Sequence, residues 1–187
     1  MIRPSAESGG PETGCPECGA PIVVGVLSDT HGHLYPDVKQ SLQGVDHIVH
    51  AGDIGSARVL TELKAIAPVT AVRGNCDLDA WARPLPTQAG LDLGGAHIVV
   101  RHIASSPRSA TTGEESGVVI TGHTHLAALE ERDGIVHLNP GSAGPRRFGR
   151  PRTLARLVVH AVPAGGSDKR GPCSWVSAEI ITLPDTE

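Results

Sequence analysis

The stretch Ile22-Val23-Val24-Gly25-Val26-Leu27-Ser28-Asp29-Thr30-His31-Gly32 decides how the rest of the sequence is interpreted. Its first half is a continuous, mostly β-branched apolar run, which is typical of a strand buried on both faces. Its second half places a carboxylate and an imidazole directly after that strand. The stretch therefore predicts a buried strand that presents polar side chains at its carboxyl end.

Two further strands follow, each after a short helical segment. Leu34, Val38 and Leu42 recur at helical spacing, and a second apolar strand covers 45–50. Ser56 is a residue type that caps helix N-termini, and a third strand is expected over 68–72. This β-α-β-α-β alternation predicts a parallel sheet with right-handed crossovers.

The second half of the chain has strand patterns without helical ones. We expect loops over 78–90 and 104–117, hairpin turns at Gly94-Gly95 and Asp133-Gly134, and strands over 96–100, 118–121, 135–138, 154–161 and 174–183. The expected fold class is therefore α/β, with two mixed β-sheets packed as a sandwich with flanking helices (αββα).

Residues 1–20 are rich in Gly, Pro, Ser and Glu, so we expect a disordered N-terminal tail followed by a single domain over 21–187. Within the tail, Cys15-Pro16-Glu17-Cys18 resembles half of a zinc ribbon, but the second C-x-x-C is missing. Zinc or redox chemistry and an unstructured leader both stay open for this pair.

Charge and hydropathy exclude several classes of partner. The net charge of -4 gives no electrostatic case for a nucleic-acid partner, and few aromatic residues are available to stack on bases. Apolar runs are too short to span a membrane, and the N-terminus lacks the apolar region of a signal peptide. We expect a cytoplasmic protein that acts on a small molecule, and a homo-oligomer is compatible with the sequence.

Residues with metal-binding side chains follow five of the predicted strands. Carboxylate, imidazole and amide groups hold borderline divalent cations, and paired cations clamp a phosphoryl group for in-line attack. Loops at the carboxyl edge of an open α/β sheet form its ligand crevice, so we expect these residues to converge. They are Asp29, His31, Asp53, Asn75, His102, His123 and His125.

Each motif has a simpler explanation when taken alone. An Asp-x-His after a strand is more often a turn with a capping Asp, Gly-Asn is a common turn dipeptide, and a single histidine such as His102 is more often structural. Five such motifs in order at one sheet edge make coincidence a poor explanation. We interpret them together as a two-metal site.

These blocks resemble the metal-binding blocks of the calcineurin-like metallophosphoesterase superfamily. The matching segments are Asp29-x-His31, Gly52-Asp53, Gly74-Asn75-Cys76-Asp77, His102 and Gly122-His123-Thr124-His125, and Asn139-Pro140-Gly141-Ser142 resembles a further block of its small bacterial phosphodiesterase branch. The match runs from about residue 22 to the C-terminus. It implies a metallophosphoesterase-like fold and a metal-dependent phosphodiesterase.

The resemblance also implies how two divalent metal ions are held. Asp29, His31 and His125 would hold one ion, Asn75, His102 and His123 would hold the other, and Asp53 would bridge them. A dimetal-bridging hydroxide would then attack phosphorus in line with the leaving group. Manganese is the expected metal, with zinc, iron and nickel as alternatives that N/O ligands do not exclude.

The chain departs from the family pattern in two places. His102-Ile103-Ala104 stands where many relatives have His-Gly-His, so the local turn must differ. Cys76 stands where monoesterases have a histidine that assists the leaving group, and a thiol is a poorer proton donor, which favours diesters or good leaving groups. A small structural residue explains Cys76 equally well, so its catalytic role beside Asp53 and Asn75 stays open.

An arginine cluster follows the last block. Arg146 and Arg147 are candidates for substrate phosphate binding, because guanidinium forks match phosphate oxygens, although a solvated loop is the simpler explanation. His50 is a candidate for orienting ligands, and His33 for a position near the substrate.

Two other functions compete with the phosphodiesterase. One is a non-catalytic protein-interaction scaffold, since one relative with this fold is a retromer sorting subunit that has lost metal-ligand histidines. The other is a nuclease, which the acidic balance and scarce aromatics disfavour. Because this chain keeps all seven expected metal ligands, the phosphodiesterase is the leading hypothesis.

Overall fold

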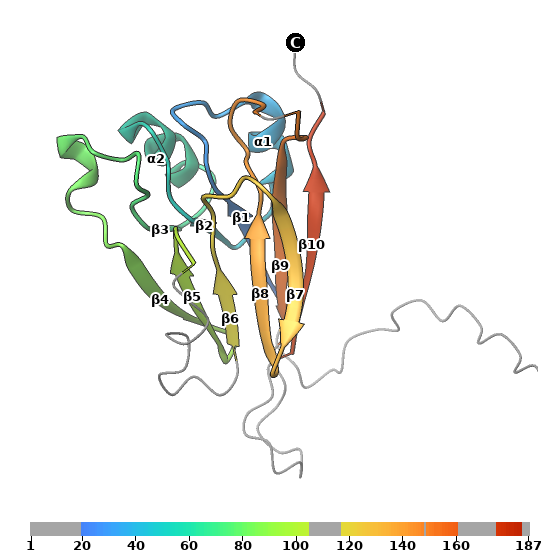
Figure 1. The fold of residues 1–187 in the computed structure, drawn as a ribbon. Helices are drawn as coiled ribbons and strands as arrows, with labels where there is room; N and C mark the ends of the chain where they lie inside the picture. Colours follow the sequence, from blue (N-terminus) through green and yellow to red (C-terminus); the bar gives the residue numbers. More distant parts are fainter. Residues whose placement is uncertain (1–19, 105–116, 148, 161–174, 185–187) are drawn as a thin grey trace, which may run out of the picture.

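The computed structural model describes residues 20–104, 117–147, 149–160 and 175–184. In this part of the chain ten strands form two five-stranded sheets (Figure 1). The strands are β1 Ile22–Leu27, β2 His47–His50, β3 Val69–Ala71, β4 Gln88–Leu93, β5 Ala96–Arg101, β6 Gly117–Ile120, β7 Ala127–Arg132, β8 Ile135–Pro140, β9 Thr153–His160 and β10 Trp175–Thr182; the helices are α1 Pro36–Ser41, α2 Ala57–Lys64 and the 3₁₀-helix η1 Ala80–Ala82.

The first sheet has the strand order β10-β9-β1-β2-β3. β1, β2 and β3 are parallel neighbours, as the alternation of strand and helix predicts. On the other side of β1, β9 pairs antiparallel with β1, and β10 pairs antiparallel with β9. The first strand is therefore central, which explains why its apolar run is uninterrupted.

The second sheet has the order β4-β5-β6-β8-β7, with β5, β6 and β8 parallel. Both predicted hairpin turns are confirmed: Gly94-Gly95 joins β4 to β5, and Asp133-Gly134 joins β7 to β8, with positive φ at all four residues. Each of the two sheets thus contains both parallel and antiparallel strand pairs, as expected for two mixed sheets.

Two segments differ from the sequence prediction. The loop expected over 78–90 contains η1 and the start of β4, and β7 was not predicted at all. β7 is an edge strand whose six residues are all exposed, so it carries no apolar alternation to mark it. β4 alternates exposed and half-buried residues, but its first residues follow a run of loop-like composition.

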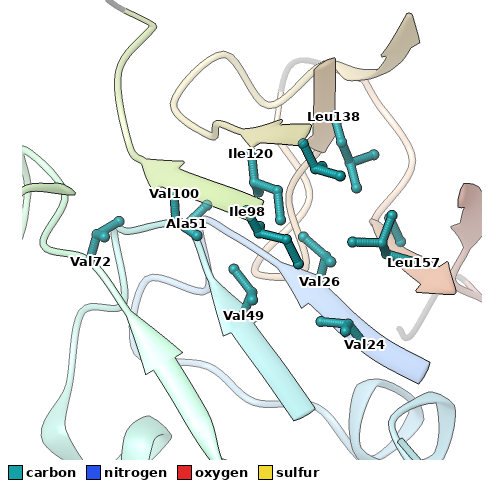
Figure 2. Packing of buried hydrophobic residues seen from close by; sticks show 12 residues of the cluster. Val24, Val26, Val49, Ala51, Val72, Ile98, Val100, Ile120, Leu138 and Leu157 are labelled. Atoms are coloured by element: carbon teal, nitrogen blue, oxygen red, sulfur yellow. The ribbon is translucent and has the colours of Figure 1, made fainter. Parts of the chain in front are cut away.

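The main core lies between the two sheets. Val24 and Val26 of β1 point toward Ile98 of β5, Ile120 of β6 and Leu138 of β8 (Figure 2). A second apolar cluster covers the opposite face of the first sheet, where both α-helices pack. Because both faces of the first sheet are packed, the ends of its strands, from which the polar loops leave, are held in place.

The N-cap prediction for α2 is confirmed. The Ser56 hydroxyl accepts a hydrogen bond from the Arg58 amide at 3.2 Å. The N-terminal tail expected over residues 1–20, with Cys15 and Cys18, and nearly all of the loop 104–117 lie outside the described residues, so these predictions stay untested. No helix among the described residues is long and apolar enough to cross a membrane.

Candidate metal centre

Loops from both sheets bring the predicted metal-binding residues together. Asp29, Asp53 and Asn75 follow β1, β2 and β3 of the first sheet, whereas His102 and His123 follow β5 and β6 of the second. The arrowheads of β5, β6 and β8 all point to the same end of the molecule (Figure 1). The predicted convergence is observed, but at the joint edge of two sheets and not of one.

The first group contains Asp29, His31 and His125, which we call the tight half of the site. The Asp29 Oδ1 atom lies 3.2 Å from His125 Nε2 and 4.0 Å from His31 Nε2, and the two imidazole nitrogens are 3.4 Å apart. The Asp29 side chain is fully buried, and the two histidine side chains are 13% and 9% exposed. Three ligand atoms thus face one small, shielded volume.

The bridging candidate Asp53 joins this half to the rest of the site. Its carboxylate belongs to one group with His31 and Cys76 and to another with Asp29 and His102, and within each group the ligand atoms lie within 4.8 Å of one another. His102 Nε2 is 3.4 Å from Asp53 Oδ1. Asp53 is therefore the residue within reach of both predicted metal positions.

The remaining predicted ligands form a looser arrangement, which we call the open half: Asn75, His102 and His123. His102 is buried, and its ring lies 5.3 Å from the ring of His123. His123 and Asn75 are both exposed, and the Asn75 amide contacts the Cys76 sulfur at 3.4 Å. The structure places these residues side by side without gathering their ligand atoms into one cluster.

Backbone strain is concentrated at the predicted ligands. Among the described residues, only six non-glycine residues have positive φ, and five of them are predicted ligands: Asp29, His31, Asp53, His123 and His125. Such conformations are costly for residues with a Cβ and persist where the surroundings enforce them, often at functional sites. The strain is thus an independent sign that these five positions serve a purpose other than folding.

Glycines let the ligand loops approach one another closely. A Cβ at Gly52, whose φ is +92°, would lie 2.7 Å from the His102 ring. A Cβ at Gly74 would overlap the Asp53 carboxylate. Both glycines directly precede a predicted ligand, so the Gly-Asp and Gly-Asn blocks in the sequence have a steric reason.

Asp77 organises the loops, a role that the sequence analysis did not assign. Its buried carboxylate accepts hydrogen bonds from the backbone amides of Ile54 (3.1 Å), Gly55 (2.8 Å) and Gly74 (2.9 Å). These amides belong to the loops that carry Asp53 and Asn75. The signal in the sequence was an acidic residue directly after the Asn-Cys pair, which the ligand pattern alone left unexplained.

The block Asn139-Pro140-Gly141-Ser142 binds the backbone of two loops that carry predicted metal ligands. The Asn139 amide donates to the Gly122 carbonyl at 2.9 Å, and the Ser142 hydroxyl donates to the Asp29 carbonyl at 3.0 Å. Both side chains are buried. They hold the backbone of two ligand loops and have no free face toward a substrate.

Several buried polar atoms at the site are suited to a cation. Within the described part of the chain, Asp29 Oδ1 and His102 Nε2 are buried and have no hydrogen-bond partner. The other His102 nitrogen, Nδ1, donates to the Ala51 carbonyl at 2.7 Å, so Nε2 faces Asp53 at 3.4 Å. Burial lowers the pKa of His102, but the Asp53 carboxylate and the Ala51 carbonyl outweigh it and raise that pKa. Buried orphan atoms are costly, so the residues present fit a metal ion.

The charges around Asp53 favour its ionised form. Burial opposes that form, but the His102 side chain and the Cys76 amide, which donates at 2.8 Å, outweigh it and hold the pKa of Asp53 below its ordinary value. Asp53 in turn raises the pKa of the Cys76 thiol, to which burial adds. The carboxylate is thus charged at neutral pH, whereas the thiol stays protonated.

His50 and His33 lie behind and beside the tight half. His50 is fully buried, and burial lowers its pKa to about 3, so the ring is neutral; its Nε2 is 2.9 Å from the Thr30 hydroxyl. His33 Nδ1 is 2.9 Å from the His31 carbonyl, and its ring stacks on Tyr35. His33 thus contacts the loop backbone directly, whereas His50 reaches it through the Thr30 hydroxyl, which also donates to the Ile54 carbonyl.

The arginine cluster divides into two kinds of residue. Arg152 is buried, forms two hydrogen bonds to the Asp37 carboxylate at 2.9 and 3.0 Å, and stacks on Tyr35, so it is structural. Arg146 and Arg147 are exposed and line a small depression together with His125. Burial and the charge of Arg147 lower the pKa of His31, which places this arginine within electrostatic reach of the tight half.

Comparison with known proteins agrees with the geometry. A probable metallophosphoesterase of Methanothermobacter thermautotrophicus is 33% identical over 149 residues, covering 73% of this chain and 86% of that protein. Phosphodiesterase YfcE of Escherichia coli is 29% identical over 161 residues, covering 70% and 84%. Vacuolar protein sorting 29 from Cryptosporidium parvum shares the fold, with a TM-score of 0.62, 20% identity and coverage of 87% and 98%.

The family assignment follows from the sequence match and from the fold together. The family model for the calcineurin-like phosphoesterase superfamily domain matches residues 22–161, which include every predicted ligand and both strand sets that position them. The chain belongs to the calcineurin-like phosphoesterase superfamily.

Proposed function

We propose that the chain is a phosphodiesterase that uses two divalent metal ions. The observation that carries this proposal is the pair of buried carboxylates, Asp29 and Asp53, whose oxygens lie within 4.8 Å of each other and of the His102 nitrogen. Two carboxylates at that distance repel each other strongly in a buried setting. A cation between them removes the repulsion and satisfies Asp29 Oδ1.

The division of ligands follows the two halves of the site. The tight half, Asp29, His31 and His125, would hold one ion, and the open half, Asn75, His102 and His123, would hold the other. Asp53 would bridge them, because its carboxylate is within reach of His31 on one side and His102 on the other. Bound ions would supply the charge that makes water acidic and that neutralises the phosphate oxygens.

The protein's own groups add orientation and selectivity. Asp53 stays ionised, so it can share its charge between two cations. The protonated Cys76 lies beside it and is a weak proton donor, which favours diesters and esters with good leaving groups over alkyl monoesters. Arg146 and Arg147 are exposed next to His125, where their guanidinium groups could bind phosphate oxygens.

We also propose which metal the site holds and where in the cell the protein acts. Carboxylate, imidazole and amide ligands suit manganese, zinc, iron and nickel, and we propose manganese as the native metal. The substrate would be a small phosphate diester in the cytoplasm, with neither nucleic acid nor membrane as partner.

Hydrolysis of bis(p-nitrophenyl) phosphate and of p-nitrophenyl phosphate tests the proposal. Protein treated with a chelator should be inactive, and manganese should restore cleavage of the diester more than of the monoester. Asp53→Asn should lower turnover at least about a hundredfold, because it removes the shared charge. Asp133→Asn is the matched control, since Asp133 also has positive φ but lies in the distant β7–β8 turn.

If neither ester is cleaved with any of the four metals, the proposal is wrong. The scaffold hypothesis would then become the leading one, and protein partners would be sought in place of substrates. Loss of activity in both Asp53→Asn and Asp133→Asn would point to a folding defect and would also contradict the assigned role of Asp53.

A further inference from the structure

A cleft of about 630 Å³ opens beside the open half of the site. Its walls include Asn75 and His102, three arginines, Arg73, Arg83 and Arg101, and the apolar side chain of Leu78. The cleft is separate from the depression lined by Arg146 and Arg147, which adjoins His125. The two arginine groups therefore lie next to opposite halves of the metal centre.

Three different segments hold the arginines of the cleft. Arg73 lies two residues beyond β3, Arg83 directly follows η1, and Arg101 is the last residue of β5. These segments are tied to one another: the Arg73 amide donates to the Pro86 carbonyl at 2.8 Å, and Arg101 pairs with Gln88 across the β4–β5 ladder. The fold, and not one flexible loop, thus brings the three positive charges together.

The positive charges of the cleft have no counterion within the described ranges. The structure gives the side chains of Arg73, Arg83 and Arg101 no hydrogen bond or ion pair there, and the Arg101 Nε atom is buried without a partner. Asp77 also lines the cleft, but three backbone amides already occupy its carboxylate. A buried, unpartnered guanidinium donor is costly, which indicates that an anion completes this surface.

We infer that the cleft binds a second phosphate group on the substrate, so that the preferred substrate is a phosphate diester bearing a phosphomonoester elsewhere in the molecule. The inference rests on the proposed function, because the scissile phosphate is assigned to the metal centre. Guanidinium forks match the oxygens of a phosphate dianion. Leu78 and Ile103, 80% and 49% exposed at the cleft, offer apolar contact to the organic linker between the two phosphates.

A pair of chromogenic substrates isolates the second phosphate. Thymidine 5′-(p-nitrophenyl phosphate) and its 3′-phosphorylated derivative contain the same scissile diester and the same leaving group. We expect the wild-type protein with manganese to cleave the 3′-phosphorylated compound with a kcat/KM at least tenfold higher, mainly through KM. Arg73→Gln, Arg83→Gln and Arg101→Gln should each remove most of this preference and leave cleavage of the unphosphorylated diester nearly unchanged.

Arg58→Gln is the matched control. Arg58 is an exposed arginine on α2 that pairs with Glu62 and is not part of the cleft lining, so this change lowers the net charge equally but should keep the preference. Arg83 is exposed and lies outside the strands, so Arg83→Gln tests the inference even if Arg101→Gln folds poorly.

Binding without turnover separates this inference from the proposed function. Thymidine 3′,5′-bisphosphate should bind chelator-treated protein in calorimetry, and each of the three cleft variants should weaken binding about tenfold or more. Citrate is added as a competitor to test whether the cleft is selective for phosphate. A phosphate site should keep the bisphosphate bound. A general anion site would bind citrate and the bisphosphate alike, which would contradict the inference. If the diesters are cleaved without preference and the variants bind the bisphosphate like wild type, the inference is wrong while the proposed function stands.

Discussion

The two halves of the metal centre differ in how the fold holds them. In the tight half, Asp29, His31 and His125 all have positive φ and bring their ligand atoms within 4.0 Å of one another. In the open half only His123 is strained, and both His123 and Asn75 are exposed.

If two ions bind as we propose, the protein backbone preorganises one metal position and leaves the other to be completed on binding. Preorganisation lowers the entropy lost when a ligand binds, so the tight half should bind its ion with higher affinity. The open half adjoins the arginine cleft, where a substrate would complete the surroundings. The comparison therefore predicts two unequal sites.

His125 and His123 offer the sharpest way to break the comparison. They lie two residues apart in the same loop after β6, and both have positive φ, which Asn tolerates. His125→Asn should abolish high-affinity metal binding and lower diester turnover by about a hundredfold or more. His123→Asn should keep the first ion and weaken only the second, which metal analysis after dialysis can measure. Equal losses of both ions in the two variants would show that the halves are equivalent.

Asp77→Asn should have a smaller effect, centred on the open half. An amide side chain has one oxygen where the carboxylate has two, so at least one of three backbone amides loses its acceptor. We expect the free energy of unfolding to fall by about 1–3 kcal/mol, measured by urea denaturation. Asp79→Asn is the control, since Asp79 is exposed and its side chain does not cap η1. An unchanged stability in Asp77→Asn would contradict the assigned role.

The fold and the site differ in how far the sequence predicts them. The buried strand β1 and the hairpin turns carry strong local signals, because a β-branched run and paired residues with positive φ have few alternatives. β7 carries none, since an exposed edge strand pairs through its backbone alone. Strand patterns in the sequence do not tell which strands pair in which sheet, so only the folded chain places the site at the joint edge of two sheets.

Local motifs likewise marked the candidate ligands more clearly than the residues that support their loops. Asp29, His31 and Asp53 stand directly after apolar runs, and their convergence follows from strand direction. The roles of Asp77 and of Arg73 do not, because they depend on backbone amides and side chains that only the folded chain brings near. The arginines that the sequence favoured, Arg146 and Arg147, were prominent because they are adjacent along the chain.

Arg147→Ala should have the smallest effect. If Arg147 binds a substrate phosphate beside the tight half, KM for bis(p-nitrophenyl) phosphate should rise a few-fold with kcat nearly constant, since one exposed guanidinium contributes about 1 kcal/mol. Arg132→Ala on the distant strand β7 serves as the control. An unchanged KM would contradict phosphate binding by Arg147 and leave it as part of a solvated loop.

A metal titration tests the central claim most directly. Chelator-treated protein is titrated with manganese in a calorimeter, and bound metal is counted independently after dialysis. We predict two ions per chain, the first bound more tightly than the second, and only one in Asp53→Asn or His123→Asn. A wild-type chain that binds no more than one ion, or two ions that Asp53→Asn leaves in place, would contradict the two-metal centre.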